Sequence, residues 1–252
     1  MRTPSFRLDG RRALVTGASR GIGLAAAHAL AEAGAEVVIA ARSADALQRA
    51  ADAIAAEHGA RVTPWVVDVA DSAGVREGLR RHGPFHVVVN NAGINRPGPV
   101  EGVTDDDLDV VLQVNVKAVF YVCREAAAMM REHGIAGSII NVSSQLGHVG
   151  LPERTIYCAS KHAVEGLTKA LAWELGRDGI RVNNVCPTVI ATEMTRAMLD
   201  NPDVLKASQA KIALGRVGQP EDMMGAFVFL ASDAAGLITG SSVMVDGGWT
   251  AV

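Results

Sequence analysis

The chain has 252 residues, of which 49% are hydrophobic, with a formal net charge of −3 and a pI of about 6.2. Charges of both signs are interspersed, which argues against a nucleic-acid-binding protein or one that binds an anionic membrane. No apolar run approaches the roughly 18 residues that span a bilayer, and no signal-peptide core follows Met1. We therefore expect a cytoplasmic protein with small-molecule partners.

Metal ions are not expected from the spacing of possible ligands. The three cysteines are odd in number and lack Cys-x-x-Cys spacing: Cys123, Cys158 and Cys186. This pattern favours reduced thiols over a disulfide framework or a zinc site. His82 and His86 are four residues apart, but Gly83 and Pro84 between them would break a helix.

An apolar run followed by a glycine-rich turn opens the chain. Residues 12–16 predict a strand, Gly17-Ala-Ser-Arg-Gly21-Ile-Gly23 follows at once, and an Ala/Leu-rich helix continues to about Ala33. The glycines allow close backbone approach, so the N-terminus of the helix could face a pyrophosphate. The spacing Gly-x-x-x-Gly-x-Gly differs from the Gly-x-Gly-x-x-Gly fingerprint, and a turn without a ligand is the alternative.

The end of the second predicted strand, residues 36–41, indicates the cofactor. An acidic residue at this place would bind the ribose 2′-hydroxyl of NAD. The sequence instead has Ala41, followed by Arg42 and Ser43. With Arg20 in the glycine turn, two guanidinium groups could flank a 2′-phosphate, which favours NADP over NAD. The alternative is an exposed arginine beside a helix N-cap at Ser43.

Apolar runs alternate with helical segments along the rest of the chain. Further strands are predicted at residues 62–67, 86–89, 138–142, 180–185 and 242–245. Since these runs lack polar alternation, we predict an α/β fold in which about seven mostly parallel strands form a doubly wound, Rossmann-type sheet covered on both faces. Residues 1–252 form one domain in this interpretation. Residues 193–218 are polar and only weakly periodic, so we expect a long irregular loop there, and the segment at about 188–218 is a candidate substrate lid.

Polar residues occur where chemistry is expected in such a sheet. Asp68 follows the third strand and could bond an adenine amine or cap the next turn. Asn115 lies among apolar neighbours in a long helical segment that starts at Thr104, so its carboxamide must find buried partners.

The stretch from Ser144 to Lys161 brings a hydroxyl, a phenol and an amine to one strand end, loop and helix start. Tyr157 and Lys161 are four residues apart, so a helix places both on one face. An ammonium at ~4 Å, with an effective dielectric of ~20, is worth about 4 kcal/mol, or roughly three pKa units. We therefore expect a lowered Tyr157 pKa and proton exchange near neutrality, a solvated helix face being the alternative.

These motifs together resemble the short-chain dehydrogenase/reductase family in its single-domain form, over nearly the whole chain from Leu8 to Gly248. The motifs that carry the resemblance are Thr16-Gly-x-x-x-Gly-x-Gly23, Asn90-Asn-Ala-Gly93, Asn115, Ser144 and Tyr157-x-x-x-Lys161. The resemblance implies that Tyr157 is the general acid in carbonyl reduction and the base in alcohol oxidation. It implies that Lys161 lowers the Tyr157 pKa and holds the nicotinamide ribose, that Ser144 bonds the substrate oxygen, and that Asn115 anchors a water chain. Ser143 is expected to be structural.

The resemblance also implies the cofactor contacts, with NADP(H) favoured and NAD(H) possible. They are Gly17, Ser19, Arg20, Gly21, Ile22, Gly23, Arg42, Ser43, Asp68, Val69, Asn90, Ala92, Gly93, Tyr157, Lys161, Pro187, Ile190 and Thr192. Asp68 and Val69 look like adenine contacts, and Ile190 and Thr192 look like carboxamide contacts. The chain departs from the family's usual Pro-Gly at Pro187-Thr188, which adds a side chain where the backbone passes the nicotinamide.

The expected function is therefore an NADP(H)-dependent interconversion of a ketone or aldehyde and an alcohol. Alternatives are an NAD-dependent sugar or polyol dehydrogenase and a cofactor-binding regulator without turnover. The family analogy implies a homotetramer. Candidate pocket residues by position are Asn95, Gln145, His148, Leu151 and Glu153. Their polarity suits an oxygenated substrate, although polar loops are common.

Overall fold

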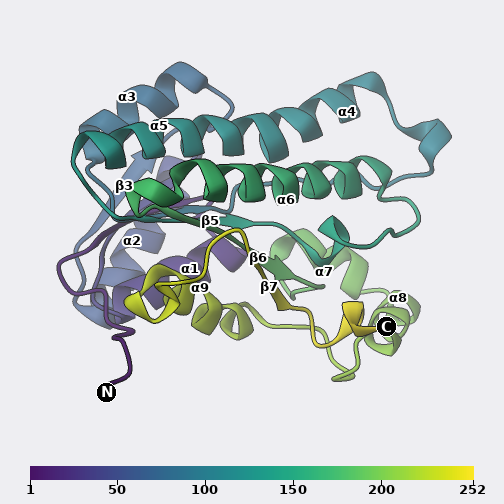
Figure 1. Cartoon of the computed structure of the whole chain (residues 1–252). Helices are drawn as coiled ribbons and strands as arrows, with labels where there is room; N and C mark the ends of the chain where they lie inside the picture. The colour runs from purple at the N-terminus through teal and green to yellow at the C-terminus, as the bar shows by residue number, and fades with distance from the viewer.

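The computed structural model describes residues 1–252, and at its centre lies a sheet of seven strands (Figure 1). In chain order the strands are β1 Arg12–Thr16, β2 Glu36–Ala41, β3 Val62–Val66, β4 Val87–Asn90, β5 Ser138–Val142, β6 Arg181–Pro187 and β7 Ser242–Val245. Their order across the sheet is β3-β2-β1-β4-β5-β6-β7, and every neighbouring pair is parallel. The prediction of a doubly wound α/β fold is confirmed.

Helices cover both faces of this sheet and enclose two apolar cores. The helices are α1 Gly21–Glu32, α2 Ala44–His58, α3 Ser72–His82, α4 Asp105–Leu112, α5 Ala118–Glu132, α6 Thr155–Leu175, α7 Glu193–Leu199, α8 Pro202–Ala210 and α9 Met224–Ala231. Side chains of α1, α2 and α9 fill one core, and those of α3, α5 and α6 fill the other. Figure 1 shows α3, α5 and α6 on one side of the strands and α1 and α9 on the other.

Strand burial explains the uninterrupted apolar runs in the sequence. Along β1, Ala13 and Val15 belong to the α1 side of the core and Leu14 to the α6 side. All three are fully buried. Because successive side chains point to opposite faces, a sheet covered on both faces needs apolar residues at every position.

The expectation of an irregular segment at residues 193–218 was wrong, because this segment contains α7 and α8. Asn201 caps α8 by accepting a hydrogen bond from the Asp203 N–H at 3.0 Å, and Pro202 occupies the first turn. Ser208 is the one buried residue of the two helices. Short helices that bury so little show no apolar periodicity, which is why the pattern did not reveal them.

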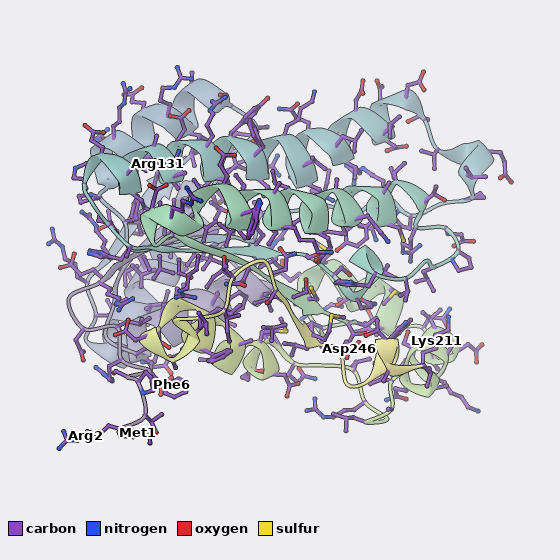
Figure 2. All side chains as sticks on the ribbon, viewed as in Figure 1. Met1, Arg2, Phe6, Arg131, Lys211 and Asp246 are labelled. Carbon is purple, nitrogen blue, oxygen red and sulfur yellow. The ribbon has the colours of Figure 1, made fainter.

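The C-terminal turn packs on the end of α8. The Lys211 Nζ lies 5.5 Å from the centroid of the Trp249 ring. The Asp246 carboxylate accepts hydrogen bonds from the N–H groups of Gly248 and Thr250, both at 2.9 Å. Figure 2 shows Lys211 and Asp246 at one end of the molecule and Met1 at the other. None of the helices combines the length and apolar character needed to cross a membrane.

The chain order reverses between β1 and β4, which are neighbours in the centre of the sheet. β1 ends at Thr16 and β4 ends at Asn90, with the glycine turn following Thr16. In open parallel sheets, ligands bind in the crevice at the carboxyl ends of the strands where the order reverses. A ligand site is therefore expected at the loops after β1, β4, β5 and β6.

Candidate active site

The glycine turn after β1 leaves no space for side chains at two positions. Gly17 has a φ of 65°, and a Cβ added there would lie 2.9 Å from the Ala92 Cα. A Cβ added to Gly23 would overlap the Asn91 Nδ2. The N-cap of α1, Arg20, makes no side-chain capping bond. The first N–H groups of α1 therefore have no side-chain cap, and such groups at a helix N-terminus suit a pyrophosphate.

Asn91, which sequence reasoning did not select, locks the glycine turn to the end of β4. Its Nδ2 donates to the carbonyls of Thr16 and Gly17, both at 3.0 Å. In return the Thr16 Oγ1 accepts from the N–H groups of Asn91 at 3.1 Å and Ala92 at 3.3 Å. The two adjacent asparagines could have indicated such a contact, but the sequence alone does not show which of them faces the glycine turn.

Asn90, the expected cofactor-side contact, directs its side chain into the protein. Its Nδ2 donates to the Asn141 Oδ1 at 2.8 Å and contacts the Cys123 Sγ at 3.2 Å. The side chain is buried. Its amide group therefore links β4 to β5.

The two arginines and the serine that were expected to contact the 2′-phosphate of NADP lie in different surroundings. The Arg20 Nη1 pairs with the Glu193 Oε2 of α7 at 2.6 Å, so its guanidinium is already engaged. Arg42 is exposed at the end of β2, beside Ala41. The Ser43 Oγ accepts from the Ala46 N–H at 3.4 Å and caps α2, as in the alternative interpretation. Of the two arginines, Arg42 is the one without a carboxylate partner in this structure.

Asp68 caps the turn that follows β3, which is the second of the two roles considered for it in the sequence analysis. Its Oδ1 accepts a hydrogen bond from the Ala70 N–H at 2.9 Å, and the neighbouring Val69 is buried. Asp68 and Arg42 line one cleft of about 730 Å³ on the outer side of β3.

Ser144 follows β5 and begins a 3₁₀ turn, Gln145–Gly147. Its Oγ donates to the Gln145 Oε1 at 2.7 Å and accepts from the Leu146 N–H at 3.1 Å. Ser144 and Gln145 are both buried. The hydroxyl predicted to bind a substrate oxygen is thus held in one orientation by its own turn.

Tyr157 and Lys161 share one face of α6 as predicted, with the Lys161 Nζ 5.6 Å from the centroid of the tyrosine ring. The Nζ donates to the Val142 carbonyl at the end of β5, at 2.8 Å. Burial lowers the pKa of Lys161 to about 8. It raises the pKa of Tyr157 to about 12, against the opposing effect of the Ser144 hydroxyl. The predicted lowering of the Tyr157 pKa was therefore wrong for the protein alone, because burial, which penalises the phenolate, has the largest effect on this group.

Asn115 lies in a π-helical turn, Gln113–Lys117, between α4 and α5. Its Oδ1 accepts from the Ile94 N–H and its Nδ2 donates to the Ile94 carbonyl, both at 2.9 Å. The Nδ2 also donates to the Ser160 Oγ at 3.1 Å. The predicted need of a buried carboxamide for partners is confirmed, and π turns of this kind are frequent at functional sites. Asn115 fixes the loop after β4 against α6.

The loop after β6 approaches the glycine turn. A Cβ added to Gly21 would lie 3.3 Å from the Thr192 Cγ2, and Ile190 is buried beside Gly218. Pro187 is the last residue of β6. The side chain of Thr188, which replaces the family's glycine, has a buried Oγ1 without a hydrogen-bond partner.

The candidate pocket residues differ in exposure. Gln145 is buried against Ser144, whereas His148 and Glu153 are exposed and Leu151 is partly exposed. Glu153 has a φ of 61°, the one positive φ among residues other than glycine. Asn95 has a buried Oδ1 without a partner.

Comparisons with known proteins agree with this geometry. A family described as enoyl-(acyl carrier protein) reductase matches residues 17–250. Gluconate 5-dehydrogenase of Gluconobacter oxydans is 41% identical over 249 residues, which cover 97% of this chain and 96% of the relative. L-xylulose reductase of Mus musculus is 41% identical over 244 residues, covering 97% and 98%. The chain belongs to the short-chain dehydrogenase/reductase family.

A solved structure of a gluconate 5-dehydrogenase from Burkholderia cenocepacia, in complex with NADP and tartrate, has the same fold. It superposes with a TM-score of 0.93 at 39% identity and covers 98% of each chain. The resemblance inferred from the motifs is therefore confirmed, and this short-chain dehydrogenase/reductase carries the family's motif residues on the expected elements.

Glu165, which was not selected from the sequence, lies on α6 one turn beyond Lys161, and its side chain is buried. Its Oε2 accepts from the Asn184 Nδ2 at 2.6 Å and the Ser242 Oγ at 2.5 Å. Its Oε1 accepts from the Cys186 Sγ at 3.3 Å and faces the His148 Nε2 at 3.2 Å. Burial acts to raise the pKa of Glu165, but the hydrogen bonds that it accepts outweigh burial and hold the pKa below its ordinary value.

The same carboxylate ends a chain of buried hydrogen bonds across the sheet. Asn90 donates to Asn141 at 2.8 Å, Asn141 donates to the Thr168 Oγ1 at 2.8 Å, and Thr168 donates to the Asn184 Oδ1 at 2.6 Å. Asn184 then donates to Glu165. In this short-chain dehydrogenase/reductase, the network ties β4, β5 and β6 to α6 beneath the candidate site.

We expect Glu165→Gln to lower the free energy of unfolding by about 1–3 kcal/mol at pH 7, because a side-chain NH2 group would face the donors of Asn184 and Ser242. The folded-state pKa of Glu165 is lowered, so its contribution is present above the ordinary value of about 4.3 and is lost as the pH falls through the folded pKa. The difference between parent and variant should therefore shrink below about pH 4.

Urea unfolding at several pH values measures this difference. Glu174→Gln, an exposed position on the same helix, is the matched control and should change stability little. A Glu165→Gln variant as stable as the control at pH 7 would contradict the role assigned to the carboxylate.

Proposed function

We propose that this protein is an NADP(H)-dependent oxidoreductase that interconverts a ketone or aldehyde and the corresponding alcohol on a polyhydroxylated substrate, such as a sugar, a polyol or a sugar acid. The observation that carries the proposal is the position of Ser144, Tyr157 and Lys161 on the loop and helix after β5, at the same edge of the parallel sheet as the glycine turn after β1. Relatives that act on gluconate and L-xylulose support the substrate class.

The cofactor site fits NADP(H), which when bound supplies or accepts the hydride. Gly17 and Gly23 let the turn after β1 pack closely against Asn91 and Ala92, and the first N–H groups of α1 that follow this turn suit its pyrophosphate. Ala41 presents no carboxylate to repel a 2′-phosphate, and Arg42 is exposed beside it. The Burkholderia relative with bound NADP supports this choice.

Tyr157 donates the proton in the proposed reduction. The carbonyl carbon gains the hydride, and the carbonyl oxygen gains the phenolic proton. The Ser144 hydroxyl turns from Gln145 to donate a hydrogen bond to that oxygen. The Lys161 ammonium stabilises the phenolate that remains. Asn115 retains a second lone pair on its Oδ1, with which it can hold a water that returns a proton toward Lys161.

Two orphaned polar atoms support a hydroxyl-rich substrate. The Thr188 Oγ1 and the Asn95 Oδ1 are both buried without a protein partner. Such atoms usually find a partner in a native structure, and substrate hydroxyl groups would supply it. We include Gln145, His148, Leu151 and Glu153 in the wall of the same pocket, and α7 and α8 as its lid.

The test of the proposed function is turnover of NADPH with a panel of ketoses, keto acids and polyols, combined with Tyr157→Phe. We expect the variant to lose about 10²–10⁴-fold in kcat while NADPH binding stays nearly unchanged, because only the proton donor is removed. Tyr121→Phe is the control, since Tyr121 is the chain's other tyrosine and lies on α5.

Activity of Tyr157→Phe above a few per cent of the parent would rule out Tyr157 as the acid. A parent protein that binds NADPH but turns over no member of the panel would support the alternative of a regulator without catalysis.

The pH dependence follows from the two shifted groups. The raised pKa of Tyr157, about 12, keeps the phenol protonated, so carbonyl reduction should be independent of pH between about 6 and 7.5. Reduction should then decline as Lys161 loses its proton around pH 8. Alcohol oxidation needs the phenolate and should rise continuously between about pH 7 and 10.

Initial rates with ordinary and 4-deuterated NADPH, and with the alcohol in the reverse direction, measure these profiles and show where hydride transfer limits the rate. An oxidation rate that reaches a plateau below about pH 8, with chemistry limiting, would show that the bound cofactor and Lys161 together lower the Tyr157 pKa.

Cofactor preference is testable at Ala41 and Arg42. A charge-assisted hydrogen bond from Arg42 to the 2′-phosphate is worth about 1.5–3 kcal/mol, so NADPH should bind at least tenfold more tightly than NADH. Arg42→Ala should weaken NADPH selectively, and Ala41→Asp should reverse the preference by repelling the phosphate and accepting from the ribose hydroxyl.

Dissociation constants from fluorescence titration decide this, with Arg49→Ala, an exposed arginine of α2, as the control. Equal weakening of NADPH and NADH by Arg42→Ala would show that Arg42 does not bind the 2′-phosphate.

A further inference from the structure

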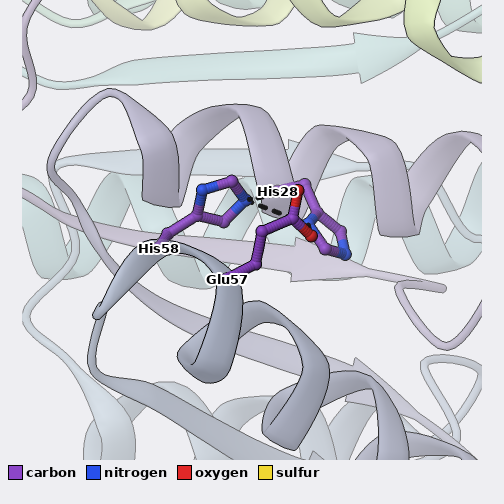
Figure 3. A group of neighbouring side chains, drawn as sticks. All are labelled: His28, Glu57 and His58. Carbon is purple, nitrogen blue, oxygen red and sulfur yellow. Dashed lines mark hydrogen bonds and ion pairs between the residues drawn. The ribbon is translucent and has the colours of Figure 1, made fainter.

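A cluster of three possible metal ligands lies between α1 and α2, apart from the candidate active site (Figure 3). The His28 Nδ1 is 3.0 Å from the His58 Nε2 and 3.3 Å from the Glu57 Oε2. The His58 Nε2 is 4.0 Å from the Glu57 Oε1. Figure 3 shows His28 projecting from one helix toward Glu57 and His58 at the end of the other.

Helix packing holds the two imidazoles in place. His58 is the last residue of α2, where Gly59 ends the helix in the left-handed conformation with a φ of 63°. The side chains of His28 and His58 are 19% and 11% exposed, whereas that of Glu57 is 63% exposed. The imidazole nitrogen atoms are therefore held in place and largely shielded from solvent. The carboxylate lies on the solvent side, from which an ion and a water molecule can enter.

The separations match those of a tetrahedral site. Zinc binds histidine nitrogen and carboxylate oxygen at about 2.0–2.2 Å, so two ligand atoms on one ion lie about 3.4 Å apart. The His28 Nδ1 lies 3.0 Å from the His58 Nε2 and 3.3 Å from the Glu57 Oε2, which are both close to this value, and the other oxygen of Glu57 lies 4.0 Å from the His58 Nε2. A hydrogen bond between the imidazoles explains the shortest separation, but one proton between the rings leaves the Glu57 Oε2, 3.3 Å from the same His28 Nδ1, without a donor of its own.

We propose that His28, Glu57 and His58 bind a zinc-class transition metal ion, with water in the fourth position, and that the ion cross-links α1 to α2. This site is independent of the proposed oxidoreductase activity. With three protein ligands and one open position, the ion should exchange with solution. Because binding requires the folded arrangement of two helices, Zn²⁺ should raise the unfolding temperature.

The test uses the full-length protein after chelator treatment and dialysis. Isothermal titration with ZnCl₂ should give one ion per chain, and scanning fluorimetry should show a higher unfolding temperature with Zn²⁺. Co²⁺ should give the intense visible absorption of four-coordinate cobalt. Glu57→Gln should weaken Zn²⁺ binding about tenfold or more, and His58→Gln about a hundredfold, while His133→Gln, an exposed histidine after α5, should leave binding unchanged.

Absence of Zn²⁺ binding would overturn the proposal, as would weak octahedral cobalt absorption. Unchanged affinity in Glu57→Gln and His58→Gln would also overturn it and would move the ion to another cluster, such as His148, Glu165 and Cys186. Glu57 is exposed, so Glu57→Gln should fold even if His58→Gln does not, and circular dichroism without metal verifies the fold of each variant.

Discussion

The attachment of α6 to the ends of β5 and β6 is the constraint on which the candidate site depends. The Lys161 Nζ is bonded to the last carbonyl of β5, and one turn later the Glu165 carboxylate accepts from donors on β6 and β7. These contacts determine where Tyr157 stands relative to Ser144. Since the groups proposed to react must be held within fractions of an ångström, directional hydrogen bonds to buried partners add precision to the apolar packing of α6.

The same anchor sets the charges of the site. Burial penalises the ammonium of Lys161, and the nearby Glu165 opposes that penalty, so the pKa of Lys161 settles at about 8. The phenol of Tyr157 stays neutral because burial penalises the phenolate and raises the pKa to about 12. In the proposed mechanism this neutral phenol is the form that donates a proton, and the phenolate would need further stabilisation once cofactor and substrate are bound. This asymmetry could not be seen from spacing, because a sequence shows that Lys161 is near Tyr157 but not that a carbonyl holds its amine.

Much of the fold could be predicted because a doubly covered parallel sheet leaves a strong signal. Apolar runs marked all seven strands, and the family motifs marked the ends of β1, β4 and β5. The failures share a cause, which is that partners distant in sequence are invisible in one chain. Arg20 was expected at a phosphate and pairs with Glu193, while Asn91 and Glu165 work through contacts 75 and 77 residues away. The helices α7 and α8 escaped detection because they bury almost nothing.

The weak burial of α7 and α8 is consistent with the lid role proposed for them. The ion pair between Arg20 and Glu193 joins α7 to the glycine turn, and its side chains are 69% and 56% exposed. Exposed pairs contribute only about 0.2–1 kcal/mol, so breaking this one costs little. Thr192, by contrast, lies against Gly21 and is tied into the start of α7 by the Thr195 hydroxyl, which accepts from its N–H at 3.0 Å. The segment is therefore attached beside the glycine turn at Thr192 and again at the end of α8, where Lys211 contacts Trp249. This leaves α7 as the most weakly held part of the proposed lid.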